Sequence, residues 1–226
     1  MRAAILVDGA FFLKRIRKIC GPLTPEQTAS ILVRGCDSLL TKYVNHENPK
    51  DIYRILYYDC PPLNKKFHNP INKQSIDLSK SELYIFRTQF HQHLLNSVNL
   101  AIRRGSLDGE NPQWTIKSQK LKELFSHKIT FDQLTEDDVV LDFRQKGVDM
   151  KIGLDIASLT LKKLVDQIIL ISGDSDFVPA AKLARREGIH FILDPMGAPI
   201  KPDLFEHIDG LFRNIWDITL LPKQKK

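Results

Sequence analysis

Five aspartates lie where predicted strands end or predicted helices begin, and they are the strongest candidates for chemistry in this sequence. One ends the apolar segment AAILVDG at residues 3–9, and two bracket a serine in IILISGDSDF at residues 168–177. Two more lie in KGVDMKIGLD at residues 146–155. If the strands are parallel, these carboxylates meet at one edge of the sheet, where open α/β sheets bind ligands. The five residues are Asp8, Asp149, Asp155, Asp174 and Asp176.

Several ionised carboxylates in one place are unfavourable unless a cation compensates their charge. Mg²⁺ or Mn²⁺ suits such a site, because both ions prefer hard oxygen ligands and retain water. A bound ion of this kind polarises a phosphodiester oxygen and lowers the pKa of a coordinated water. The pattern therefore predicts metal-dependent phosphodiester hydrolysis. The expected catalytic residues are Asp8, Asp149, Asp174 and Asp176, and the expected metal ligands are Asp8, Asp149, Asp174 and Asp155.

Each aspartate taken alone also fits a helix cap, which is a common role for this residue. Asp155 raises a further difficulty, because it follows Asp149 by six residues and lies about 240° from it around an α-helix. The two side chains cannot face one ion in the same way. Either the helix begins after Asp149, or one of the two acts from outside the ligand sphere.

Other polar residues near these segments are candidates for binding a phosphate. Ser172 and Ser175 have hydroxyls that fit a phosphate or a metal-bound water, although serines at a strand-to-helix turn are commonly caps. Lys146 fits either a phosphate contact or a solvated side chain. The basic pair Arg103 and Arg104 completes the set of expected substrate-binding residues.

The elements that must position these residues follow from the apolar patterns. The short β-branched run at residues 168–172, ended by Gly173, is typical of a buried parallel strand, and the helical spacing of apolar residues resumes at Phe177. The same reasoning predicts strands at residues 3–7, 51–59 and 189–193. The predicted helices cover residues 11–19, 24–44, 146–164, 176–187 and 202–207. We expect an α/β domain with a central, mostly parallel sheet over residues 1–226.

The pattern loosens over residues 63–141, which we interpret as a mainly helical insertion. Within it we expect a long helix over residues 80–104, a short hairpin around residues 114–116, and a strand at residues 139–145. Residues 64–128 carry eleven Lys and Arg against five Asp and Glu, so we expect the insertion to contact a phosphate backbone. Four aromatic residues beside the basic groups are candidates for stacking on bases, although aromatics in helices more often belong to the core. They are Tyr84, Phe86, Phe90 and Trp114.

The composition limits the class of protein. The chain has 226 residues, of which 42% are hydrophobic and 27% charged, as in globular domains. Its net charge of +6 favours a polyanionic partner, of which nucleic acid is the commonest. Cys20, Cys36 and Cys60 encode neither a disulfide framework nor a zinc knuckle, which predicts a reducing, cytoplasmic setting. No run of about 18 apolar residues predicts a membrane span. A homodimer is compatible with the sequence.

Three motifs carry a resemblance to a known family. VDGA at residues 7–10, KGVD at residues 146–149 followed by Asp155, and ISGDSDFVPAAKLARREG at residues 171–188 resemble the NYN domain branch of the PIN-like nucleases, which includes LabA-like proteins. The resemblance implies a PIN-like three-layer α/β/α sandwich, a divalent-metal site and an RNA substrate. By position, it implies acidic site residues at Asp8, Asp149, Asp174 and Asp176, with Asp155 as a further member. This chain departs from the pattern after the first aspartate, where many relatives carry an asparagine and this sequence has Phe11 and Phe12.

Two functions remain open from the sequence. The first is a metal-dependent ribonuclease with a basic insertion that binds the RNA backbone. The second is a regulatory module of the same fold that binds RNA or a protein without turnover. A HAD-like phosphatase does not fit, because its motif needs an aspartate two residues after the first, where this chain has Ala10.

Overall fold

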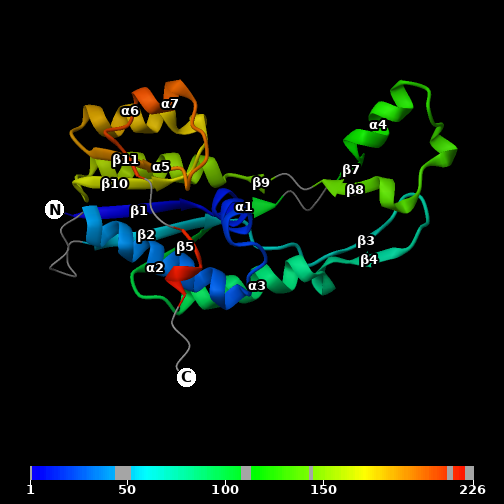
Figure 1. The fold of residues 1–226 in the computed structure, drawn as a ribbon, viewed down its shortest axis with the longest axis horizontal. Helices are drawn as coiled ribbons and strands as arrows, with labels where there is room; N and C mark the ends of the chain where they lie inside the picture. The colour runs from blue at the N-terminus through cyan, green and yellow to red at the C-terminus, as the bar shows by residue number, and fades with distance from the viewer. Residues whose placement is uncertain (1, 44–51, 108–112, 143–144, 213–215, 222–226) are drawn as a thin grey trace.

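A parallel β-sheet forms the centre of the molecule (Figure 1). The computed structural model describes residues 2–43, 52–107, 113–142, 145–212 and 216–221. Within these residues the central sheet has six strands in the order β12-β11-β10-β1-β2-β5, and every neighbouring pair is parallel. The strands are β1 (Ala3–Asp8), β2 (Ile52–Asp59), β5 (Leu100–Arg104), β10 (Gln167–Ile171), β11 (His190–Asp194) and β12 (Gly210–Leu211).

Helices cover both faces of the sheet and give three layers. One face carries α1 (Gly9–Cys20), α2 (Pro25–Tyr43) and α3 (Glu82–Leu95). The other face carries α5 (Val148–Leu161), α6 (Val178–Arg186) and α7 (Pro202–Glu206). This arrangement confirms the predicted α/β/α sandwich with a parallel central sheet.

The central strands are buried on both faces, which explains their continuous apolar sequences. In β1, Ile5 packs into the core on the α1 side, whereas Leu6 packs into the core on the α5 side, and both are fully buried. Side chains on β10 alternate in the same way. A parallel sheet covered by helices on both faces requires this pattern, because successive side chains point to opposite faces.

An arm extends from the end of the sheet at which the strands finish (Figure 1). We define the arm as residues 65–80 together with residues 113–142. It contains the antiparallel pair β3 (Lys66–His68) and β4 (Ser75–Asp77), the antiparallel pair β7 (Gln113–Ile116) and β8 (Val139–Asp142), and α4 (Ser118–Phe125). Three short 3-10 helices complete it, namely η2 (Leu78–Lys80), η3 (Phe131–Gln133) and η4 (Glu136–Asp138). The pair β6 (Ser106–Leu107) and β9 (Gln145–Lys146) joins the arm to the sandwich.

The segment predicted as one insertion, residues 63–141, is divided between the arm and the sandwich. α3 packs against α2, and β5 pairs with β2 at the edge of the central sheet. The helix expected over residues 80–104 therefore ends at Leu95, and the chain turns at Asn99, which has a positive φ of 57°. Asparagine tolerates this conformation, and the apolar run after it can then pair as a strand. The strand expected around Trp114 exists, but its partner is β8 rather than an adjacent strand.

The other predicted elements are confirmed with small shifts at their ends. The helix over residues 176–187 is a 3-10 turn, η5 (Ser175–Phe177), followed by α6. Two predicted ends, at residues 44 and 51, lie outside the described residues, as do residues 143–144 within the strand predicted at residues 139–145. Among the helices of the described chain, none combines the length and apolarity needed to cross a bilayer.

Gly9 gives a direct test of how tightly α1 packs against β2. A Cβ atom at Gly9 would lie 2.5 Å from the Tyr58 carbonyl oxygen and 2.6 Å from the Tyr57 hydroxyl. Because one of these groups is backbone, we expect Gly9→Ala to lower the free energy of unfolding by about 1–3 kcal/mol. The measurement is urea unfolding followed by circular dichroism.

Gly153→Ala is the matched control, because a Cβ at Gly153 in α5 meets no atom within 4 Å. Alanine favours a helix over glycine by about 0.8–1.0 kcal/mol, so this variant should be at least as stable as the wild type. Equal effects of the two substitutions would contradict the close approach of α1 to β2.

Candidate active site

The candidate site lies at the carboxyl ends of β1 and β10, two neighbours in the middle of the sheet. After β1 the chain enters α1 on one face, and after β10 it enters η5 and α6 on the other face. The strand order therefore reverses between β1 and β10. Such a switch point opens a crevice at the carboxyl edge, where α/β sheets bind ligands.

Asp8 is the central carboxylate of the crevice. It ends β1 and caps α1, with Oδ1 accepting a hydrogen bond from the Phe11 amide at 3.1 Å. Its Oδ2 accepts a hydrogen bond from the Ser172 hydroxyl at 3.3 Å. Burial is the main cause that raises the pKa of Asp8, and the nearby charges of Asp149 and Asp174 raise it further, against the two hydrogen bonds.

Asp149 lies in the first turn of α5 and is exposed. Its pKa is also raised, first by burial of part of the carboxylate and then by the charges of Asp174 and Asp176. Asp174 caps η5 by accepting a hydrogen bond from the Asp176 amide at 3.0 Å. Asp8, Asp149, Asp174 and Asp176 therefore form one electrostatically coupled group, which we call the acidic cluster.

The acidic cluster has no cation of its own among the described residues, because none of the ion pairs there involves its four carboxylates. The same residues contain no group of three His, Cys, Asp or Glu side chains close enough to form a ready metal cage. Mg²⁺ does not need such a cage, since it keeps several waters and uses one or two carboxylates. Oxygen donors that repel one another fit a hard divalent cation.

Asp155 is held away from the acidic cluster. Its Oδ2 accepts a hydrogen bond from the Tyr58 hydroxyl at 2.8 Å and forms an ion pair with Arg103 Nε at 3.2 Å. Burial, followed by the hydrogen bond to Asp155, raises the pKa of Tyr58 well above its usual value. Because α5 begins at Val148, both Asp149 and Asp155 lie on one helix, and the turn of that helix separates them.

The expected phosphate-binding residues have different surroundings. Ser172 is fully buried and joins the two strand ends, since its hydroxyl donates to Asp8 and accepts from the Asp174 amide at 3.3 Å. Ser175 accepts a hydrogen bond from Lys201 Nζ at 3.0 Å, which brings an unforeseen cation to the rim. Lys146 is described by its backbone, which pairs with Ser106.

The two arginines at the end of β5, Arg103 and Arg104, make different contacts. Arg103 is bound to Asp155 and keeps 48% of its side chain exposed. The Arg104 side chain is exposed, and its carbonyl oxygen accepts a hydrogen bond from Lys151 Nζ at 2.5 Å. Arg103 is therefore occupied by a structural partner, whereas the Arg104 side chain faces solvent.

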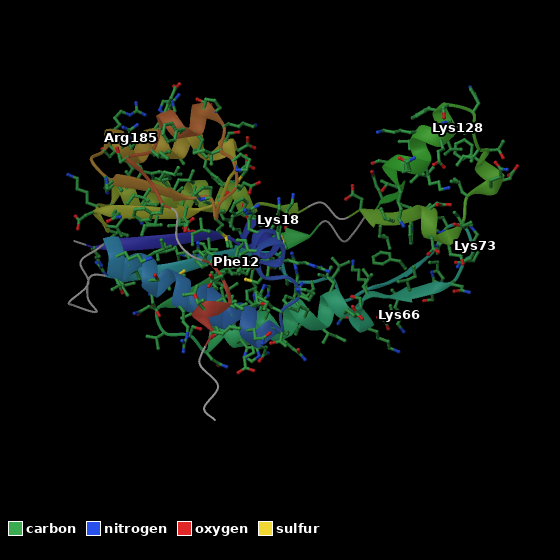
Figure 2. The ribbon with its side chains drawn as sticks, viewed as in Figure 1. Phe12, Lys18, Lys66, Lys73, Lys128 and Arg185 are labelled. Atoms are coloured by element: carbon green, nitrogen blue, oxygen red, sulfur yellow. The ribbon has the colours of Figure 1, made fainter. Side chains whose placement is uncertain are left out.

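The two phenylalanines after Asp8 have distinct roles. Phe12, labelled in Figure 2, is fully buried, and its ring meets the Trp216 ring edge to face at a centroid distance of 5.8 Å. The Phe11 ring lies against the strand-to-helix turn of β10, because a Cβ at Gly173 would be 2.8 Å from it. Phe11 therefore forms an apolar wall beside the acidic cluster.

Two further strands end in aspartates that the sequence analysis did not select. Asp59 ends β2 and is fully buried between Arg87 at 3.1 Å and His91 at 2.9 Å. Asp194 ends β11, and its Oδ2 accepts a hydrogen bond from Trp216 Nε1 at 2.7 Å. Burial raises the pKa of Asp194 to about 6. The signal was present in the sequence, since each aspartate follows an apolar strand just as Asp8 does.

The arm is less basic than the predicted insertion. Figure 2 shows Lys66, Lys73 and Lys128 on the arm, away from the sheet. Lys66 lies 3.8 Å from Asp77, and Lys120 pairs with Glu123 at 3.1 Å. The part of the arm beyond residue 128 adds acidic residues that oppose this charge, namely Asp132, Glu136, Asp137, Asp138 and Asp142.

The aromatic residues predicted to stack on bases differ in their exposure to solvent. Phe90 is fully buried in the core, so it is not available to a base. Tyr84, Phe86 and Trp114 are partly exposed. The most exposed aromatic residues in the described arm are instead Phe125 and Phe131, at 78% and 73%.

Comparison with known proteins identifies the family. The model of the NYN domain family matches residues 71–201, which is more than half of the chain. The matched range includes Asp149, Asp174 and Asp176, whereas β1 and Asp8 precede it. No curated protein matches the chain. A solved structure of a protein of unknown function from Vibrio parahaemolyticus is similar at 16% identity and a TM-score of 0.47, over 93% of this chain and 90% of that one.

The family match agrees with the strand order and with the motifs that end β10 and begin α5, while placement in the LabA-like branch stays a prediction. The chain belongs to the NYN domain family of the PIN-like nuclease superfamily, whose members are typically nucleases that usually use divalent metals.

Proposed function

We propose that this protein is a divalent-metal-dependent ribonuclease that hydrolyses RNA phosphodiester bonds at the acidic cluster. One observation carries the proposal: at the switch point of the sheet, burial and then the charges of neighbouring carboxylates raise the pKa values of Asp8 and Asp149, and the described residues form no ion pair with the cluster. Such repulsion is tolerated where a bound cation relieves it.

The side chains of the cluster have separable roles. Asp8 is oriented through both oxygens, by the Phe11 amide and by Ser172, and Asp174 is oriented by the Asp176 amide. A bound Mg²⁺ or Mn²⁺ would supply charge neutralisation at these oxygens and would lower the pKa of a coordinated water. Asp149 is exposed and its pKa is raised, so it suits the acceptance of a proton from the attacking water.

The remaining parts of the proposal concern the substrate and its setting. Lys201, held against Ser175 at the rim, suits the neutralisation of a phosphate oxygen. The net charge of +6 favours a polyanion, and the resemblance to the family implies that this polyanion is RNA. We expect the protein to act in the reducing cytoplasm, and a homodimer stays a prediction.

A second candidate is an RNA-binding regulatory module with little or no turnover. One observation favours it: Phe11 and Phe12 follow the first aspartate, where the resemblance to the family implies an asparagine. The two functions differ in what Asp8 does. In the enzyme, Asp8 is needed for cleavage. In the module there is no cleavage to lose, and replacement of Asp8 leaves RNA binding unchanged.

We expect RNA cleavage in Mn²⁺ or Mg²⁺ that falls by about 10²–10⁴-fold in Asp8→Asn and in Asp174→Asn, because each change removes a carboxylate from the reacting centre. The measurement is the rate of cleavage of a labelled single-stranded RNA, with and without EDTA.

Asp166→Asn is the matched control for this loss. Asp166 accepts a hydrogen bond from the Arg2 amide at 2.7 Å, at the opposite edge of the sheet, so the variant should keep wild-type activity. Cleavage that persists in EDTA, or full activity in both cluster variants, would reject the enzyme in favour of the module.

The raised pKa of Asp8 also predicts a change in stability. The folded protein binds a proton at Asp8 more tightly than the unfolded chain does, so this contribution is present at acidic pH and is lost as pH rises through the raised pKa. Asp8→Asn removes the buried negative charge. In EDTA at pH 7 the Tm of the variant should therefore exceed that of the wild type, by about 2–4 °C for each kcal/mol of added stability.

The measurement is thermal unfolding from pH 4 to pH 8, with and without Mn²⁺. Addition of Mn²⁺ should raise the Tm of the wild type more than that of Asp8→Asn. A lower Tm for the variant across the whole pH range would show that Asp8 serves only as the cap of α1.

A further inference from the structure

A groove lies between α1, the connection from α1 to α2, and the first turns of α3. Its volume is about 720 Å³. Both α1 and the start of α3 lie near the end of the sheet that faces the arm (Figure 1). The groove is lined by both apolar and basic side chains, including Leu13, Lys14, Arg17, Leu23, Phe86 and Arg87.

The charge of the groove favours an anion. Lys14, Arg17 and Arg87 line it, against a single acidic residue, Glu82. Arg87 is fixed by Asp59 at 3.1 Å and keeps 15% of its side chain exposed. Its Nε is buried with no acceptor in the part of the chain that the structure describes, so only the exposed part of the guanidinium can meet a ligand in the groove. A rigid guanidinium matches the oxygens of a phosphate.

The apolar part of the groove suits a flat ring. Leu13, Leu23 and Phe86 are partly buried and pack against the core on the α1 side. The Phe86 ring stacks on Phe90 at 6.1 Å with an interplanar angle of 18°, so its orientation is set by the core. Aromatic rings next to cations are the features with which proteins bind single-stranded nucleic acids, since every base has a face that stacks.

The groove begins close to Asp8 of the acidic cluster along the chain. Ala10 lines it and follows Asp8 by two residues, at the start of α1. Arg87 reaches the end of β2 through Asp59, and β2 is the neighbour of β1. A strand of RNA with one phosphate at Asp8 can therefore continue into the groove.

We propose that this groove binds one or two unpaired nucleotides of the RNA next to the phosphate that is cleaved, with a base against Phe86 and a phosphate against Arg87 and Lys14. The proposal rests on the ribonuclease function proposed above. A volume of about 720 Å³ suits a nucleotide, within the roughly 300–1,000 Å³ of small-molecule sites. A base in a duplex is stacked and paired, so it cannot enter, and the groove selects single-stranded RNA.

Two lysines on α1 provide the test. Lys14 lines the groove, whereas Lys18, labelled in Figure 2, is exposed on the same helix and does not line it. Binding of a short fluorescein-labelled single-stranded RNA is measured by anisotropy in EDTA, so that no cleavage occurs. Lys14→Gln should weaken binding several-fold and lower the salt slope by about one, whereas Lys18→Gln should leave both unchanged.

Phe86→Leu tests the stacking contact with a side chain that preserves the apolar packing. We expect its affinity for the same RNA to fall about tenfold, with an unchanged salt slope, because stacking carries no charge. An RNA duplex of the same sequence should compete poorly. Thermal unfolding checks that each variant is folded.

Equal losses in Lys14→Gln and Lys18→Gln, or unchanged affinity in both Lys14→Gln and Phe86→Leu, would overturn the groove and would favour a protein segment as its occupant. Equal competition by the duplex would also overturn it. Since binding is measured without turnover, a protein that fails to cleave RNA but shows these differences supports the groove and rejects only the nuclease.

Discussion

The structure depends on how a parallel sheet distributes the negative charge that gathers at its carboxyl edge. Strands β2, β1 and β11 end on aspartates, and Asp174 follows β10 after a short turn. The outer two, Asp59 and Asp194, are buried and bound to Arg87 and Trp216. The inner two, Asp8 and Asp174, are bound by amides and by a serine. The outer aspartates therefore have an ion-pair or hydrogen-bond partner inside the sandwich. The inner aspartates have no ion pair among the described residues, so negative charge is concentrated at the switch point.

This division gives the two parts of one sheet edge opposite effects on stability. Removing Arg87 or Trp216 would strand a buried polar group, which costs stability. Asp8 and Asp149 impose the opposite cost, since folding buries them and places them near other carboxylates, and both effects raise their pKa values. Sites of this kind are common where proteins bind ions or carry out catalysis. Phe11 and the buried Ser172 keep this charge in place, because one limits the crevice on its apolar side and the other joins the two strand ends.

Much of the sandwich could be predicted from sequence because its signals are local. The buried runs of β1 and β10, the capping box before α2 and the spacing after Gly173 each specify their own element. The convergence of Asp8 and Asp174 followed from the rule that parallel strands end at one edge. The position of β5 could not be predicted in this way, because the sequence pattern of α3 gives no clear stop before β5. The chain turns between the two elements at Asn99, which has a positive φ. Pairings such as β7 with β8 join segments separated by α4, and local patterns carry no information about them. The environment of Asp155 likewise depends on Tyr58 and Arg103, which reach it from distant strands.

The register of β1 with β10 also has a consequence for synthesis. Ala3 pairs with Gln167, so the middle of the sheet joins residues from near the start of the chain to residues made much later. A nascent polypeptide that has not yet reached β10 holds Asp8 on an unfinished edge, with no Ser172 and no second carboxylate beside it. Contacts between such distant residues also form slowly, because a long loop must close first. The acidic cluster therefore forms only after the chain has been synthesised through β10 and the turn that follows it.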